Sequence, residues 1–205
     1  MNLIQTVQKG APKKSHNQYV QSIIDILSKC PFPGLIIELG VAHGRNAIII
    51  GNTIKALKLD TKYVGFDTFV GYAQEDMDNK ALKDIQRRKV WHTTKEKVED
   101  TISKAGLSDI CTLIEGDLKE TLPQFLIEHN PEIALLYIDC NAYLPSITGM
   151  TATIGHVKRG SIICIDEHRI GGETKALEEF SKTMKHRITK TGDTIGIPAY
   201  IKVGG

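Results

Sequence analysis

Short apolar runs alternate with amphipathic stretches along most of the chain. Five runs are mainly apolar and bounded by glycine or polar residues; they occupy 35–39, 63–66, 111–114, 133–138 and 161–165. Runs of this length are typical of strands that are buried on both faces of a sheet. Two more strands are expected near the end of the chain, at 187–191 and 199–203, with a turn at Gly192 and Asp193.

Between the strands, apolar residues recur every three or four positions, which predicts helices that bury one face. Three such faces consist of Tyr19, Ile23, Ile26 and Leu27; of Ile147, Met150, Ile154 and Val157; and of Ala176, Leu177, Phe180 and Met184. Another helix is expected to begin at Thr121, with Pro123 in its first turn, and to run to about His129. The alternation predicts an α/β fold with a mostly parallel sheet and helices on both faces.

The segment 71–97 departs from this alternation. It is long, polar and poorly periodic at its start, so it is predicted to be an insertion or a lid over a site. Residues 1–33, which precede the first strand, form an N-terminal helical segment in this interpretation. A chain of 205 residues has room for one well-packed core, so we expect a single domain over 1–205.

Composition narrows the class of protein. Apolar residues make up 41% of the chain and charged residues 24%, as in ordinary globular enzymes. The formal net charge of +2 is too small to predict nucleic acid or an anionic membrane as the main partner. There is no CxxC pair, no apolar run long enough to span a membrane and no apolar signal core. We therefore expect a soluble cytoplasmic protein with reduced thiols, whose oligomeric state, monomer or homo-oligomer, stays open.

A glycine turn follows the first predicted strand. In an open parallel sheet, ligands bind beyond the carboxyl ends of the strands. Gly40 and Gly44 permit a tight turn and close approach of a ligand to the backbone, so we expect a cofactor over Gly40, Ala42 and Gly44. The spacing G-x-x-x-G differs from that of dinucleotide enzymes, and a turn needed only for packing is the alternative. Glu38, inside the apolar strand, is costly to bury without a partner.

Carboxylates also follow the second and third strands. Asp67, with Thr68 and Phe69 beside it, lies where a carboxylate could accept both hydroxyls of an adenosine ribose. Asp117 follows the third strand, where an adenine amino group could bind. The alternatives are a helix or turn cap for Asp67 and a helix cap for Asp117.

The fourth and fifth strands end in a denser acidic group. Asp139 follows one strand, and Asp166, Glu167 and His168 follow the other. If the strands are neighbours, about 5 Å apart, three carboxylates meet at one edge of the sheet. Clustered carboxylates repel one another unless a cation or a proton joins them, and oxygen ligands favour magnesium. Alternatively, Asp139 binds the cofactor while Asp166 and Glu167 cap a loop.

Taken together, these motifs resemble the macrocin O-methyltransferase family, which includes methyltransferases of antibiotic sugars such as noviose. The matching pieces are 38–41, 67–71, 116–123, 138–143, 165–167 and 176–180. Each is short, and their shared order over about 34–184 carries the resemblance. It implies the Rossmann-like class I methyltransferase fold, with S-adenosylmethionine held by Glu38, Gly40 and Asp67. It also implies magnesium bound by Asp139, Asp166 and Glu167.

The implied reaction is methyl transfer from S-adenosylmethionine to a hydroxyl of a small molecule, such as a sugar, a catechol or another polyol. The metal would lower the pKa of that hydroxyl, and Asp139 would take the proton, with His168 and His43 as alternative bases. The chain departs from the family at 42–45 and at 140–142, which leaves the acceptor open. A metal-independent methyltransferase, a nicotinamide oxidoreductase and a non-catalytic nucleotide-binding module are the alternative functions.

Overall fold

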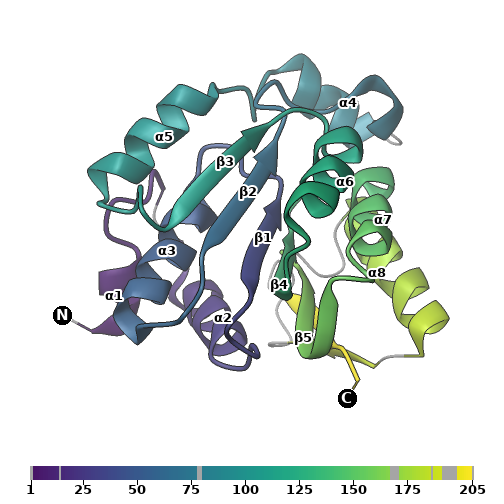
Figure 1. Ribbon diagram of the computed structural model, residues 1–205. Coiled ribbons are helices and arrows are strands. Elements are labelled where there is room, and N and C mark those ends of the chain that lie inside the picture. The colour runs from purple at the N-terminus through teal and green to yellow at the C-terminus, as the bar shows by residue number, and fades with distance from the viewer. Residues whose placement is uncertain are drawn as a thin grey trace.

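A twisted sheet with helices on both faces forms the centre of the computed structural model (Figure 1). The structure describes residues 2–13, 15–77, 80–166, 171–185, 187–190 and 198–204. Within these residues the strands are β1 (Leu35–Leu39), β2 (Tyr63–Asp67), β3 (Cys111–Glu115), β4 (Ile133–Ile138), β5 (Val157–Ile165), β6 (Ile188–Lys190) and β7 (Ala199–Lys202). Their order is β3-β2-β1-β4-β5-β7-β6, and β7 is antiparallel to both of its neighbours, whereas β1 to β5 are parallel.

Helices cover the sheet in two layers, one on each face (Figure 1). They are α1 (Leu3–Val7), α2 (Asn17–Leu27), α3 (Arg45–Leu57), the 3-10 turn η1 (Gln74–Asp76), α4 (Lys80–Arg87), α5 (Lys95–Lys104), α6 (Leu118–His129), α7 (Tyr143–Ala152) and α8 (Gly171–Met184). Residues of α1, α2, α3 and α5 share one apolar cluster, and residues of α6, α7 and α8 share the other. Along β4 the side chains alternate between these clusters: Leu135 and Tyr137 join the first, Leu136 and Ile138 the second. This double burial explains why the central strands are continuously apolar.

The predicted α/β class and the seven strands are confirmed, with corrections at some boundaries. Helix α6 begins at Leu118, three residues before the predicted start, because Asp117 caps it by accepting a hydrogen bond from Lys119 N at 2.9 Å. The predicted apolar face of α7 is wrong at its end. The helix stops at Ala152, where the Thr153 hydroxyl bonds back to Gly149 O, and Val157 instead begins β5. The predicted turn at 192–193 lies outside the described residues.

The segment 71–97 contains η1, α4 and the first turn of α5, so it is more helical than its sequence pattern indicated. It is joined to the body of the protein by hydrogen bonds. Thr93 N donates to Phe69 O at 2.9 Å, and the Gln86 side-chain amide donates to Val70 O at 3.2 Å. Its role as a lid stays a prediction. In the described part of the chain, each helix is too short or too polar to cross a membrane.

The sheet order places the ends of β2, β1, β4 and β5 side by side at one edge. Backbone bonds continue past the strands: Asp139 N donates to Leu39 O, and Asp166 N donates to Ile138 O, both at 2.8 Å. These bonds continue the sheet pairing to the residues that follow β4 and β5. The strand order reverses between β1 and β4, because β2 and β3 lie on one side of β1 whereas β4 and β5 lie on the other, and open α/β sheets bind ligands at such a point.

Candidate active site

A cavity of about 370 Å³ lies over this edge of the sheet. Its walls are residues 40–43, 45–46, 66–68, 71–73, 116–118 and 139–141, with Pro12, Lys13, Asp76, Trp91, Pro145 and Asp166. Of the predicted cofactor residues, Gly40, Ala42, Asp67, Thr68, Asp117 and Asp139 line it, and Glu38, Gly44 and Phe69 do not. Gly44 starts α3, and Phe69 is buried in the core. The cavity is large enough for a small organic ligand.

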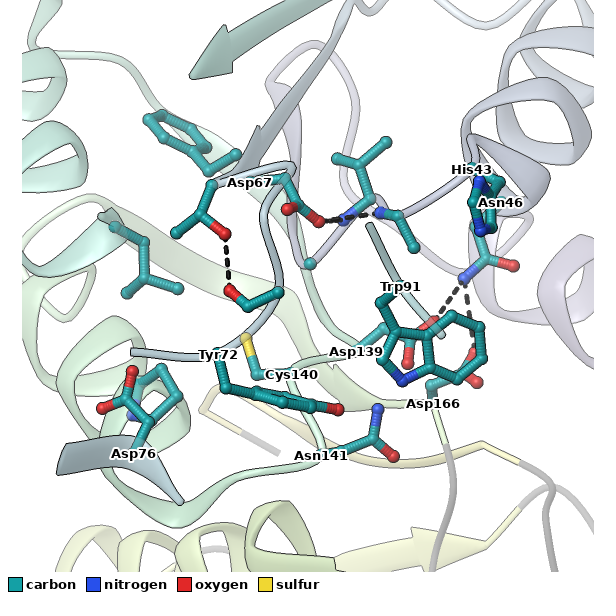
Figure 2. A pocket seen from close by; sticks show the side chains of 18 of the residues that line it. His43, Asn46, Asp67, Tyr72, Asp76, Trp91, Asp139, Cys140, Asn141 and Asp166 are labelled. Atoms are coloured by element: carbon teal, nitrogen blue, oxygen red, sulfur yellow. Dashed lines mark hydrogen bonds between the residues drawn. The ribbon is translucent and has the colours of Figure 1, made fainter. Parts of the chain in front are cut away.

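The turn after β1 is held in place by Asp67. One carboxylate oxygen of Asp67 accepts hydrogen bonds from Val41 N and Ala42 N, both at 2.7 Å (Figure 2). The other oxygen accepts from Phe69 N at 2.6 Å. Asp67 therefore acts as the turn cap that was the alternative interpretation. A carboxylate oxygen accepts more than one hydrogen bond, so a ribose contact stays compatible with this arrangement.

Glu38 lies beneath the turn and is fully buried. The Tyr63 hydroxyl on β2 donates a hydrogen bond to Glu38 Oε2, whereas Oε1 has no partner in the described structure. Burial raises the pKa of Glu38 to about 8. Gly65, which pairs with Glu38 in the sheet, leaves space for this hydroxyl, because a Cβ there would lie 2.7 Å from it. Glu38 is thus held inside the sheet by Tyr63, and a direct contact to a cofactor stays a prediction.

Asp117 combines the two roles that the sequence left open. It caps α6 and also lines the cavity. Lys119 Nζ lies 3.1 Å from the Asp117 carboxylate and 2.9 Å from Asp76, which is on η1. Lys119 therefore ties the start of α6 to the segment 71–97, and the predicted adenine contact of Asp117 stays a prediction.

Asp139 and Asp166 come together, as the neighbouring strands predict. The Asn46 amide donates to Asp139 at 3.1 Å and to Asp166 at 3.5 Å (Figure 2). The side chain of Asp139 is 23% exposed, whereas that of Asp166 is only 2% exposed. Asp139 therefore offers the accessible carboxylate in this part of the cavity. Glu167 and His168, also predicted site residues, lie outside the described residues.

Hydrogen-bond donors surround Asp166. Its Oδ1 accepts from the hydroxyl of Tyr19 on α2 and from the hydroxyl of Tyr137 on β4, the latter at 2.5 Å. Its Oδ2 accepts from Arg45 Nη2 at 3.3 Å. The predictions missed Arg45, Asn46, Tyr19 and Tyr137, which reach the site from three different elements. The one available signal was the unusual 42–45 turn, which ends in Arg45.

Burial and neighbouring charges both shift the pKa of Asp139. Burial raises its pKa well above the usual carboxyl range, and the charges of Asp166, Glu173 and Glu38 raise it further, whereas Arg45 lowers it. Aromatic side chains stand close by: Figure 2 shows Tyr72 and Trp91 around the same space as Asp139 and Asn141. Burial, and then Asp139, raise the pKa of Tyr72. The Tyr72 hydroxyl is therefore a neutral donor, not a base.

The described residues do not fit a magnesium ion. A magnesium site needs oxygen ligands with free lone pairs, arranged octahedrally with several waters. Among the described residues, no group of three Asp, Glu, His or Cys side chains could hold a metal. Both oxygens of Asp166 accept hydrogen bonds, and the Arg45 cation already lies against it. The predicted ligand role of Glu167 stays untested.

The model of the macrocin O-methyltransferase (TylF) family matches residues 13–197. No curated protein sequence matches the chain significantly.

Three solved structures with the same fold illustrate the structural similarity. CalS11, described as a TDP-rhamnose 3′-O-methyltransferase of calicheamicin biosynthesis, is 25% identical, with a TM-score of 0.62 over 91% of this chain and 79% of that one. The O-methyltransferase NovP is 20% identical, with a TM-score of 0.76 over 97% and 87%. The O-methyltransferase TomG from Streptomyces achromogenes, solved with S-adenosylmethionine, is 12% identical, with a TM-score of 0.63 over 100% and 91%.

Proposed function

Because the chain belongs to the macrocin O-methyltransferase family, and so is an S-adenosylmethionine-dependent O-methyltransferase, we propose that it methylates a hydroxyl of a small molecule beside Asp139. The observation that carries this proposal is the shared cavity, in which a glycine turn and an accessible carboxylate face the same space. The carbon–sulfur bond breaks with its electron pair going to sulfur, the carbon–oxygen bond forms, and the hydroxyl proton leaves.

The cofactor is proposed to lie over Gly40 and Ala42. Its ribose would bind to Asp67 and its adenine would approach Asp117, since both carboxylates line the cavity on that side. Asp67 already fixes the turn through two backbone amides, so the surface against which the cofactor packs is formed before it binds. Such preorganisation lowers the entropic cost of binding.

The acceptor is proposed to lie between Asp139 and the aromatic side chains of Tyr72 and Trp91. Aromatic faces pack well against a flat ring or the apolar face of a sugar, so a sugar, a catechol and another polyol all suit this wall. Asp139 would accept the hydroxyl proton. His43 is less suited to this role, because its Nε2 lies 3.3 Å from Val90 O. Alignment of the methyl group with the oxygen supplies the rest of the rate enhancement.

Three further predictions from the sequence concern magnesium, the location in the cell and the class of substrate. Magnesium is set aside in the steps above, because Asp166 is already satisfied by protein donors. A cytoplasmic location agrees with four free cysteines, three of which are buried. The net charge of +2 still favours a small molecule over nucleic acid as the substrate.

Calorimetry with S-adenosylmethionine and S-adenosylhomocysteine is the first test. Both should bind with one site per chain. A panel of sugars, catechols and polyols is then incubated with labelled S-adenosylmethionine, and products are identified by mass spectrometry as O-methylated compounds. Absence of cofactor binding would overturn the proposal, and binding without transfer to any acceptor would favour the non-catalytic module.

Asp67→Ala is expected to weaken S-adenosylhomocysteine binding by roughly 1.5–3 kcal/mol, the scale of a lost hydrogen bond to a charged group. The substitution also frees the backbone amides of Val41 and Ala42, so part of the loss comes from a less ordered turn. Calorimetry measures the effect, with Asp60→Ala, an exposed loop carboxylate, as the control. Equal affinity of wild type and Asp67→Ala would contradict the placement of the ribose.

The segment 71–97 is expected to exchange its amide hydrogens faster than the central strands in the free protein, and more slowly once cofactor and acceptor bind. The reason is that the segment lines the cavity, with Tyr72 and Trp91 among its residues there, and that backbone and side-chain hydrogen bonds hold it to 69–70. Hydrogen exchange followed by mass spectrometry measures this. Protection as high as that of β4 in the free protein would show that the segment is not a lid.

A further inference from the structure

Arg45 lies at the acidic edge of the site and lines the cavity. Its Nη2 is 3.3 Å from Asp166 Oδ2 and 3.9 Å from Asp139 Oδ2. The same atom donates to the Tyr19 hydroxyl at 3.0 Å, and Nε donates to Asn46 Oδ1 at 3.2 Å. The guanidinium carbon also lies 4.7 Å from the centre of the Tyr19 ring. The position of this cation is therefore fixed by several contacts, although its side chain keeps 34% exposure.

Arg45 places a positive charge beside two of the three carboxylates that were expected to bind a metal. A guanidinium stays charged at every ordinary pH, so its effect on Asp139 and Asp166 is permanent. A divalent cation between the same carboxylates would have to displace the guanidinium or lie next to it, and like charges repel. A cation that binds Asp166 Oδ1 would also compete with the Tyr19 and Tyr137 hydroxyls for this oxygen.

We propose that Arg45 takes the place of a divalent cation in this site, so that methyl transfer proceeds without metal. This inference rests on the proposed function. Arg45 lines the cavity and uses Nε and Nη2 for its contacts to described residues, so the two N–H groups of Nη1 are the ones that would bind the acceptor oxygen. They stabilise the negative charge that grows on that oxygen as its proton moves to Asp139 and its bond to the methyl carbon forms. The electron pair of the broken bond stays on sulfur.

Manganese binding tests this inference without an acceptor. Mn²⁺ is titrated into the metal-stripped protein and free Mn²⁺ is followed by electron paramagnetic resonance. Wild type is expected to bind no Mn²⁺ at about 1 mM, a concentration that occupies even weak protein sites for divalent cations. Arg45→Met removes the charge and keeps an apolar stem, and it is expected to bind Mn²⁺ more than about tenfold more tightly.

Arg45→Lys and Arg87→Met complete the comparison. Arg45→Lys keeps a positive charge and is expected to exclude Mn²⁺ as wild type does. Arg87 is on α4 and its side chain is 77% exposed, so Arg87→Met controls for the loss of one surface charge and should not gain Mn²⁺ affinity. If Arg45→Met does not fold, the wild-type titration still decides whether the site binds a divalent cation.

The two proposals fail in different ways. Stoichiometric Mn²⁺ binding by wild type, or loss of methyl transfer in EDTA that Mg²⁺ restores, would overturn the role of Arg45 and leave the methyltransferase intact. Absence of S-adenosylhomocysteine binding would overturn the proposed function, whatever the Mn²⁺ result. Wild type that excludes Mn²⁺, binds the cofactor and keeps its activity in EDTA would support both.

Discussion

Asp139→Asn is expected to lower kcat for methyl transfer by about 10²–10⁴-fold, the range for loss of a positioned proton acceptor. Asparagine keeps the size of the side chain and can still accept the hydrogen bond from Asn46, so the fold should be preserved. It cannot take the acceptor proton at this position. Affinity for S-adenosylhomocysteine should change little, because the ribose and adenine are proposed to bind on the other side of the cavity.

The measurement separates kcat from KM for an acceptor identified in the screen, with cofactor affinity from calorimetry. Asp100→Asn is the control, because Asp100 is exposed on α5 and pairs with Lys104 away from the cavity. It should leave kcat unchanged. An Asp139→Asn enzyme with wild-type kcat would exclude Asp139 as the base, whereas a rise in KM alone would make it an acceptor-binding residue.

The fold and the position of the site could both be predicted from the sequence, and for the same reason. A strand of a parallel sheet is apolar on both faces, so β1 to β5 stand out as short apolar runs. All these strands point the same way, so the residues after them meet at one edge of the sheet. This is why Asp67, Asp117, Asp139 and Asp166 were found together without knowledge of the strand order.

The hydrogen-bond donors around Asp166 could not be predicted from the sequence in this way. Tyr19 comes from α2 and Arg45 from α3, and their distance from β5 depends on how two helices pack on the sheet, which no local pattern encodes. The sequence therefore shows an excess of negative charge after β4 and β5. A bound metal ion is the simplest way to compensate this charge that the sequence suggests. The structure shows another way to compensate it: the Arg45 guanidinium and the hydroxyls of Tyr19 and Tyr137 all donate hydrogen bonds to Asp166. Which of these operates is decided by the Mn²⁺ titration.

The errors in the predicted starts of α6 and β5 have local causes. Pro123 suggested the first turn of a helix, but the Asp117 cap starts α6 earlier and the proline sits inside the helix. Gly160 allows β5 to begin before its apolar run, since φ at this residue is +93° and the pairing with β4 shifts register nearby. In both cases a single cap or glycine outweighed the periodic pattern, as is usual at the ends of elements.

Gly40→Ala is expected to destabilise the protein by roughly 3–5 kcal/mol and to abolish measurable cofactor binding. Gly40 has φ of +89°, which a residue with a Cβ adopts only at a cost. An added Cβ would also lie 2.2 Å from the Asp139 carbonyl oxygen, a backbone atom that is itself fixed by the bond from Asp139 N to Leu39 O. Relief of this clash would push β1 and β4 apart where the site is formed.

Thermal unfolding and calorimetry with S-adenosylhomocysteine measure both effects. For a chain of this size the midpoint should fall by about 10 °C. Gly155→Ala is the matched control, because a Cβ at Gly155 would meet no atom within 4 Å, and its stability should change by less than about 0.5 kcal/mol. If Gly40→Ala unfolds at the wild-type temperature and still binds S-adenosylhomocysteine, the close approach of the turn to β4 does not shape the site. If it is folded at low temperature but does not bind, the turn is part of the cofactor surface, and the contact between β1 and β4 sets its position.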